Sequence, residues 1–381
     1  MTSARWLLLP HMSSRVPDTR CGTVQGEHTM DSEDSQDWPQ VLVVGDGYSQ
    51  ANWPFLVPRL TEQLGHHDVA VRSLSVTTGS RLRDLDGVAA AAALVLLDVV
   101  PEAQDIAAMS ALEVVAGVTD GAPLAVAGVL AERGIPFVDG SRGRDRSRAE
   151  MAIGLMQAGL RQIPAWHLMT WQGPSGWPPV SWQVTDNVTL VNGTIHGKAV
   201  VVIGSDPVGQ QIAQFCSMFG AVVSVVDADA EDAWSPTDWS RRELRNVWSC
   251  ADIVVSASGP GTPQMSSDMV DLLPTGALVV TVTSHGIDLA ALRRRASAGQ
   301  LAWATDVYDT APVPIADPLL GRENVVHTPG VAARTCDAMV AIADVLADNI
   351  IRVLGGNPPL CWDHIAPPPA ETTSAALAVR G

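Results

Sequence analysis

The stretch "GKAVVVIGSDPVGQQIAQFCSMFGAVVSVVDAD", residues 197–229, decides the fold of this chain. A short apolar run leads into a glycine-containing turn, then a helical pattern, then a second apolar run that ends in an acid. This order predicts strand, tight turn, helix and strand, which is the unit that binds dinucleotides. Gly204 and Gly209 allow the turn and the close packing of helix on strand. Asp227 is placed to bond ribose hydroxyls and to favour NAD over NADP.

The middle position of the glycine turn holds Asp206 instead of glycine. Aspartate is a strong N-cap and Pro207 suits the first helical position, so we expect a well-capped helix here. A pyrophosphate charge about 4 Å from this carboxylate costs roughly 4 kcal/mol at an effective dielectric of 20. Two interpretations stay open: an NAD site made of Gly204, Asp206, Gly209 and Asp227, or a unit kept for its fold alone.

Strand and helix patterns alternate along the rest of the chain as well. This alternation predicts an α/β fold with two Rossmann-like domains of doubly wound parallel sheets. Further strands are expected at "VLVVGDG", "AAAALVLLDVV", "ADIVVSAS", "ALVVTVTS", "LAWATDVY" and "NVVHTP". Long helices are expected from Ser147 and across "TCDAMVAIADVLADNIIRVLGG". Prolines in "PAWHLMTWQGPSGWPPVSWQ" predict an extended surface loop whose tryptophans serve as packing anchors.

The composition and charge of the chain exclude several classes of partner and ligand. The chain has 381 residues, a net charge of −17 and no basic cluster, so we expect neither a nucleic-acid nor a membrane partner. Its five cysteines are scattered without metal-ligand spacing, which predicts no metal site. No apolar run reaches about 20 residues and no signal peptide is recognisable, so we expect a cytoplasmic protein. Residues 1–38 are predicted to be disordered and residues 367–381 to form a flexible tail.

An ordered set of blocks resembles the D-isomer-specific 2-hydroxyacid dehydrogenases, from about Val41 to Pro359. The blocks are "AERGIPFVDG", "RAEMAIGLM", "GKAVVVIG", "LPTGALVVTVTSHGID", "LAWATDVYDTAP" and "DPLLGRENVVHTPGVA". The resemblance implies a nucleotide-type domain, residues 147–335, inserted into a discontinuous outer domain, residues 39–146 plus 336–366. It also implies a small-molecule ligand in the cleft between the domains and a homodimer formed through the nucleotide-type domain.

The resemblance also implies where a catalytic set should lie, and this chain lacks it. Family catalysis uses an Arg that holds the substrate carboxylate and carbonyl, and a His oriented by a Glu. The Arg position is Ser284 or Thr283 here, the Glu position is Ala311 and the His position is Gly330. The usual hydride exchange on a 2-hydroxy acid is therefore not expected.

Four polar residues near the vacated positions are candidate catalytic groups. Arg334 lies four residues after Gly330 and can bind a carboxylate, or it can simply belong to the helix start. His285 and Asp309 would form an acid/base pair if they met, although each also suits a solvent-facing loop. Tyr308 is a candidate proton donor.

Three functions remain compatible with these residues. The first is a repurposed enzyme with redox-neutral chemistry, which would isomerise, eliminate from or cyclise a small carbonyl- or carboxylate-containing metabolite. The second is an atypical NAD-dependent oxidoreductase, which requires NAD(H) binding. The third is a pseudoenzyme that binds a protein partner, with the tryptophan-rich stretch as a contact surface.

Overall fold

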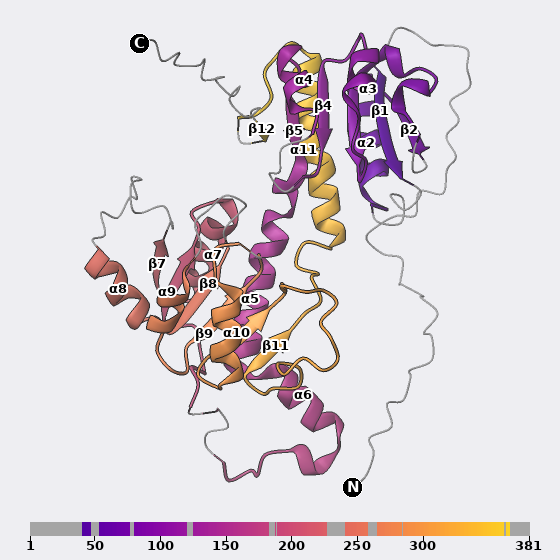
Figure 1. The fold of residues 1–381 in the computed structure, drawn as a ribbon. Helices are drawn as coiled ribbons and strands as arrows, with labels where there is room; N and C mark the ends of the chain where they lie inside the picture. The colour runs from indigo at the N-terminus through magenta and orange to yellow at the C-terminus, as the bar shows by residue number, and fades with distance from the viewer. Residues whose placement is uncertain are drawn as a thin grey trace, which may run out of the picture. The chain divides into compact units, whose positions relative to one another are not determined.

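The protein is described from a computed structural model (Figure 1). The structure describes residues 40–46, 53–76, 80–119, 125–182, 187, 189–226, 241–257, 265–283, 285–361 and 363–365. The predictions of disorder for residues 1–38 and of a flexible tail for residues 367–381 lie outside this part of the chain. Within it, two parallel sheets with helices on both faces confirm the predicted α/β class.

The first sheet has the strand order β12-β5-β4-β3-β1-β2. Its strands are β1 (Gln40–Asp46), β2 (Ala70–Val76), β3 (Ala91–Leu97), β4 (Val114–Gly117), β5 (Phe137–Asp139) and β12 (His364–Ile365). All pair in parallel except β12, which runs antiparallel to β5. The order reverses between β1 and β3, and ligands of doubly wound sheets bind outside the carboxyl ends of the strands at such a switch point.

Apolar side chains alternate between the two faces of this sheet, and each face is covered by its own helices. The helices are α2 (Leu56–Gly65), α3 (Ala103–Ala108), α4 (Ala127–Glu132) and α11 (Cys336–Leu354), with the short turns η1 (Leu82–Asp84), η2 (Val88–Ala90) and η3 (Gly140–Arg144). One core joins Val41 and Val43 to α2 and α11, and the other joins Leu42 and Val44 to α3 and α4. The last long helix therefore packs on the first sheet.

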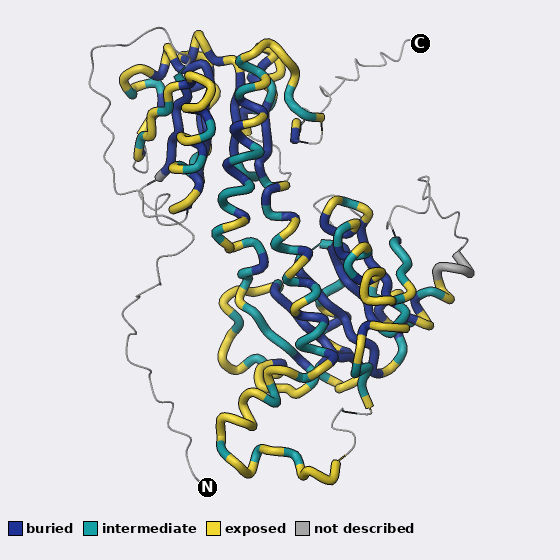
Figure 2. Tube along the Cα trace, turned by 180° about the vertical axis from the view of Figure 1, so that it is seen from behind, coloured by how far each residue is buried: buried dark blue, intermediate teal, exposed yellow. Residues whose placement is uncertain are grey.

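The second sheet has the strand order β11-β10-β9-β8-β6-β7, and all its strands are parallel. They are β6 (Ala199–Ile203), β7 (Val222–Val226), β8 (Ile253–Ser256), β9 (Leu278–Thr281), β10 (Ala302–Thr305) and β11 (Val325–His327). Its helices are α5 (Asp145–Arg161), α7 (Pro207–Met218), α8 (Arg241–Ser249), α9 (Ser267–Leu272) and α10 (Leu289–Ser297). The central strands are buried along their whole length, as the dark tube in Figure 2 shows, because helices cover both faces.

The tryptophan-rich stretch differs from the expectation. Residues 163–171 form helix α6 (Ile163–Trp171), and a short turn η4 (Pro174–Gly176) follows. The helix tolerates its proline because Pro164 occupies the first turn, where no intrahelical N–H bond is lost. The tryptophans were predicted to be packing anchors, and this prediction is wrong within the single chain. Trp171, Trp177 and Trp182 are 76%, 65% and 57% exposed.

Candidate functional site

The glycine turn between β6 and α7 has the geometry of a dinucleotide loop. Gly204 adopts a φ of +106°, which favours glycine. A Cβ at Gly209 would lie 2.0 Å from the carbonyl oxygen of Gly204, so only glycine lets helix and turn approach this closely. The two glycines at the ends of the motif are thus required by the backbone.

The carboxylate of Asp206 occupies the start of α7, as predicted. Asp206 is the N-cap, its Oδ1 accepts a 2.9 Å hydrogen bond from the amide of Gly209, and Pro207 is the first helical residue. A helix N-terminus attracts anions through such free amides, and here one of them already has an anionic partner. The two glycines suit a dinucleotide turn, and the N-terminus of the helix that follows carries the carboxylate of Asp206. Asp227, the predicted ribose ligand, lies outside the described residues.

A buried aspartate holds the loop that carries Gly330. Asp306 is 3% exposed and follows β10 directly. Its Oδ1 accepts from the hydroxyl of Thr328 at 2.6 Å and the amide of Val331 at 2.9 Å, and its Oδ2 accepts from the amide of Ala332 at 2.7 Å. Three donors satisfy the carboxylate, so it fixes the course of residues 328–332.

The described positions at which the family resemblance predicts a catalytic set carry no ionisable group. Gly330 has a φ of +71°, and a Cβ placed on it would meet only the Asp306 carbonyl oxygen, at 3.7 Å. Ala311 is exposed. Thr283 donates a long 3.4 Å hydrogen bond to the carbonyl of His285, while Ser284 lies outside the described residues. A Cβ on residue 330 would have room, although the φ of +71° is one that residues with a side chain rarely adopt.

The structure does not bring the candidates His285 and Asp309 together by a hydrogen bond. The Oδ1 of Asp309 lies 3.6 Å from the Nη1 of Arg293 on α10. The carbonyl oxygen of His285 accepts a 2.6 Å hydrogen bond from the hydroxyl of Ser256. The imidazole ring of His285 has no hydrogen bond within the described part of the chain. Each residue therefore has a local environment of its own.

Tyr308 is tied into the second sheet. Its hydroxyl donates to the carbonyl of Thr328 at 2.9 Å and lies 3.3 Å from the Nδ1 of His327, whose ring stacks on it. Burial, followed by the nearby charge of Asp306, raises the pKa of Tyr308 to about 12. A phenol with this pKa stays protonated at neutral pH, which suits a fixed donor better than a proton shuttle.

Arg334 lies in a pocket beside the start of α11. The cavity has a volume of about 570 Å³ and is lined by Trp53, Asp98, Arg144, Gly330, Ala333, Arg334, Met339 and Ile342. Thr335 is the N-cap of α11, so Arg334 does not serve as the cap. Its exposed guanidinium has no hydrogen bond or ion pair among the described residues. Arg334 is thus a candidate catalytic residue that lines a pocket.

Three polar residues of this pocket were not singled out by the sequence. Asp98 follows β3, and Trp53 lies beyond the end of β1, so both lie at the switch point of the first sheet. The Nε1 of Trp53 donates a 2.6 Å hydrogen bond to the Oδ2 of Asp98. Arg144 lies over the indole ring, with its Cζ 5.2 Å from the ring centroid. The available signal was positional: an acid directly after a fully apolar central strand.

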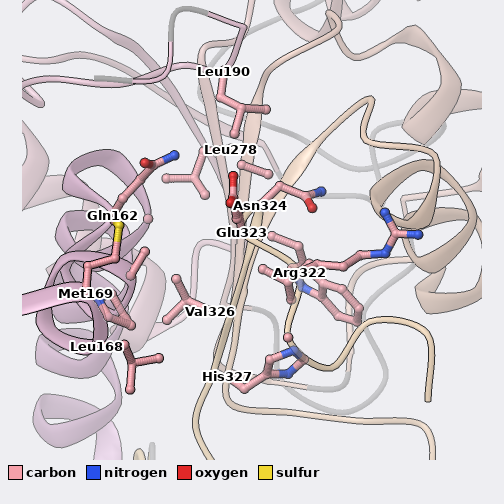
Figure 3. A pocket seen from close by; sticks show the side chains of 17 residues that line it. Gln162, Leu168, Met169, Leu190, Leu278, Arg322, Glu323, Asn324, Val326 and His327 are labelled. Atoms are coloured by element: carbon pink, nitrogen blue, oxygen red, sulfur yellow. The ribbon is translucent and has the colours of Figure 1, made fainter. Parts of the chain in front are cut away.

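A second cavity lies between α6 and the edge strand β11 (Figure 3). It has a volume of about 390 Å³, and Leu168 and Met169 of α6 face Val326 and His327 across it. Its polar groups are largely used by the fold. The amide of Asn324 donates to the carbonyls of Ala296 and Leu301, and the Nε2 of His327 lies 3.2 Å from the carbonyl oxygen of Leu319. This cavity offers mostly apolar contact.

The described residues hold neither a membrane-spanning helix nor a cluster of metal ligands. No helix there is long and apolar enough to cross a membrane. Among the same residues, no three or more His, Cys, Asp or Glu side chains gather as metal ligands would. The pocket beside α11 holds the unpaired guanidinium of Arg334, which has no hydrogen bond or ion pair among the described residues.

The sequence of this chain matches a family model and several known proteins. Residues 153–332 match the family model described as D-isomer specific 2-hydroxyacid dehydrogenase, NAD binding domain. A D-3-phosphoglycerate dehydrogenase of Archaeoglobus fulgidus is 28% identical over 233 residues, which cover 60% of this chain and 42% of that protein. The D-3-phosphoglycerate dehydrogenase of Mycobacterium tuberculosis is 30% identical over 281 residues, covering 68% and 51%. The chain thus spans about half the length of these curated relatives.

Solved structures agree on the fold. The NADPH-dependent glyoxylate/hydroxypyruvate reductase of Sinorhizobium meliloti, solved with citrate, superposes with a TM-score of 0.65. It is 21% identical, and the match covers 87% of this chain and 99% of that one. At this identity the similarity shows a shared fold only. The chemistry of the site has to be argued from the residues that form it.

Proposed function

Because the chain belongs to the D-isomer specific 2-hydroxyacid dehydrogenase family, we propose that it is an enzyme that uses this fold for redox-neutral chemistry on a small carboxylate. Isomerisation, elimination and cyclisation are the reaction types in view. The observation that carries the proposal is Arg334, which lies four residues after Gly330 and lines a pocket. Its guanidinium has no partner in the described part of the chain. A guanidinium binds a carboxylate with two parallel hydrogen bonds, so it can take over the anchoring role of the missing arginine.

The vacated positions support a change of reaction. Reduction of a 2-oxo acid by hydride requires a proton at the new hydroxyl, and the family's donor is the imidazole that Gly330 lacks. Ala311 has no group to orient such an imidazole. The Asp306 clamp meanwhile keeps the loop in a defined shape beside the pocket. A preserved frame around a replaced set of polar groups favours a different reaction over simple decay.

The proposal is tested by separating binding from redox turnover. The purified chain is incubated with NADH and with glyoxylate or hydroxypyruvate, and absorbance at the nicotinamide band is followed. We expect no oxidation of NADH, and we expect a carboxylic-acid panel to yield NMR-detectable binders and rearranged products without NADH consumption. The Arg334→Gln variant should lose both binding and product. Arg81→Gln is the matched control, because Arg81 is also exposed and has no side-chain partner among the described residues. Stoichiometric NADH oxidation would reject the proposal.

A second candidate is an atypical NAD-dependent oxidoreductase. The specific observation in its favour is the glycine cradle of Gly204 and Gly209, together with the match to an NAD binding domain. NADH binding, read by energy transfer from tryptophan and checked by calorimetry, tests it. Micromolar binding with substrate-dependent oxidation would make this function the leading one.

The chain's partner is proposed to be a second copy of itself. Helix α6 and the residues after it expose Trp171, Trp177 and Trp182, and an aqueous surface rarely leaves so many large apolar groups uncovered in one segment. Sedimentation of the wild type and of Trp171→Lys tests this. A dimer that dissociates on substitution supports self-association. A wild-type monomer would favour the pseudoenzyme alternative, in which another protein covers this segment.

A further inference from the structure

The pocket beside α11 contains one open positive group and one open negative group. Its ionisable lining residues are Asp98, Arg144 and Arg334. Arg144 is engaged, since it lies over the Trp53 ring and has a further polar or charged interaction. Arg334 has no side-chain partner among the described residues. Asp98 uses Oδ2 for the Trp53 hydrogen bond, and its Oδ1 has no partner among them.

Asp98 is an exposed residue, and the hydrogen bond from Trp53 holds one oxygen of its carboxylate in place. Trp53, the donor to Asp98, is only 8% exposed, so the hydrogen bond starts from a fixed side chain. The backbone of Asp98 adopts a φ of +58°, a conformation that non-glycine residues rarely take and that recurs at functional sites. It lies directly after β3, at the switch point where doubly wound sheets bind ligands.

We propose that this pocket binds a small amino acid as a zwitterion. Its carboxylate pairs with Arg334, its ammonium group pairs with Asp98, and an aliphatic side chain lies against Met339 and Ile342 of α11. This inference rests on the proposed function, because it names the substrate class of the same pocket. The two open groups have opposite charge, so a ligand with one group of each sign leaves neither unpaired.

Other small acids match the two open groups less well. The second carboxylate of a dicarboxylate would face Asp98 and be repelled by it. A hydroxy acid supplies a neutral donor to Asp98, which makes a weaker hydrogen bond than a charged ammonium does. A simple carboxylate leaves Asp98 without a partner. The expected order of affinity is therefore amino acid, then hydroxy acid, then simple carboxylate.

The test uses three ligands of one shape: leucine, 2-hydroxy-4-methylpentanoate and 4-methylpentanoate. Both enantiomers of the first two are titrated into the full chain by calorimetry. We expect one enantiomer of leucine to bind about tenfold tighter than either hydroxy acid. Asp98→Asn should reduce this ratio to about one, while Arg334→Gln should weaken all three ligands at least about tenfold. Arg81→Gln should change nothing.

The outcomes separate this inference from the proposed function. If the hydroxy acid binds as tightly as leucine, or if Asp98→Asn leaves their ratio unchanged, the amino-acid assignment is overturned while carboxylate binding stands. If no ligand binds at about 10 mM, or if Arg334→Gln has no effect, both proposals fall. The asparagine amide oxygen can still accept from Trp53, so Asp98→Asn is expected to fold, and its thermal unfolding is measured alongside.

Discussion

The indole nitrogen of Trp53 lies 2.6 Å from Asp98 Oδ2, across 45 residues of sequence, and this hydrogen bond joins the segment before α2 to the end of β3. It fixes a carboxylate at the switch point and leaves the other oxygen of that carboxylate available. The relationship makes the pocket a site with a defined negative group.

Replacing Trp53 by Phe tests this hydrogen bond. The ring beneath Arg144 is kept and the N–H donor is lost, so we expect unfolding free energy to fall by about 1 kcal/mol. Trp53→Ala also opens a cavity and should cost about 3–5 kcal/mol. Urea denaturation measures both. Equal losses for the two variants would mean that the hydrogen bond, and not ring packing, dominates.

Removing the charge of Asp206 should strengthen NADH binding. Asp206→Ser keeps an N-capping oxygen and removes the carboxylate, whereas Asp206→Gly removes both. We expect NADH affinity to rise at least about tenfold in both variants, because a repulsion of up to roughly 4 kcal/mol is relieved. Only the glycine variant should lose stability, by a few tenths of a kcal/mol. An unchanged affinity in Asp206→Ser would show that the carboxylate does not oppose the cofactor.

The two glycines Gly209 and Gly330 should respond differently to alanine. At Gly209 the new Cβ meets the Gly204 carbonyl oxygen at 2.0 Å, so the backbone must move and about 3 kcal/mol is expected to be lost. At Gly330 the site is open and only the φ of +71° is unfavourable, at about 1 kcal/mol. Denaturant titration gives the order, and a larger loss at Gly330 would contradict it.

A pH-dependent ion pair anchors the segment before β11. The Nη2 of Arg293 lies 2.5 Å from Asp317 Oδ2, and this hydrogen bond holds the pKa of Asp317 below its usual range. Because the folded-state pKa is the lower one, the stabilisation is present above about pH 4 and is lost as pH falls through the folded-state value. The melting temperature of the wild type should exceed that of Asp317→Asn at pH 7, and the difference should shrink towards pH 3. A constant difference would contradict the linkage.

The sequence predicted the elements whose signals are local. The apolar runs of β1, β6 and β9 and the long patterns of α5 and α11 identified themselves by period and length. The N-cap role of Asp206 was also local, since cap and first turn are adjacent in the chain. The prediction for the tryptophan-rich stretch was wrong twice. The prolines were interpreted as helix breakers although Pro164 lies in the first turn of α6, where proline is tolerated, and Trp171, Trp177 and Trp182 are exposed.

The residues of the pocket beside α11 could be predicted from the sequence only in part. Arg334 was singled out because it lies near a position that the family resemblance marks. Trp53, Asp98 and Arg144 come from three separate segments, and their proximity depends on strand order and on the packing of α11. The spacing of residues in one sequence does not show which strand ends are neighbours. The grouping of these three residues could therefore be identified only from the structure.

The clamp on Asp306 has an evolutionary consequence. Three donors to one buried carboxylate define the path of residues 328–332, and none of these donors is the side chain at position 330. The hydrogen bonds that define the loop do not involve the tip side chain, so a change of residue at position 330 costs mainly the backbone strain of its φ of +71°, about 1 kcal/mol. Selection on chemistry and selection on folding act on different residues of this loop, which leaves the tip open to new activities.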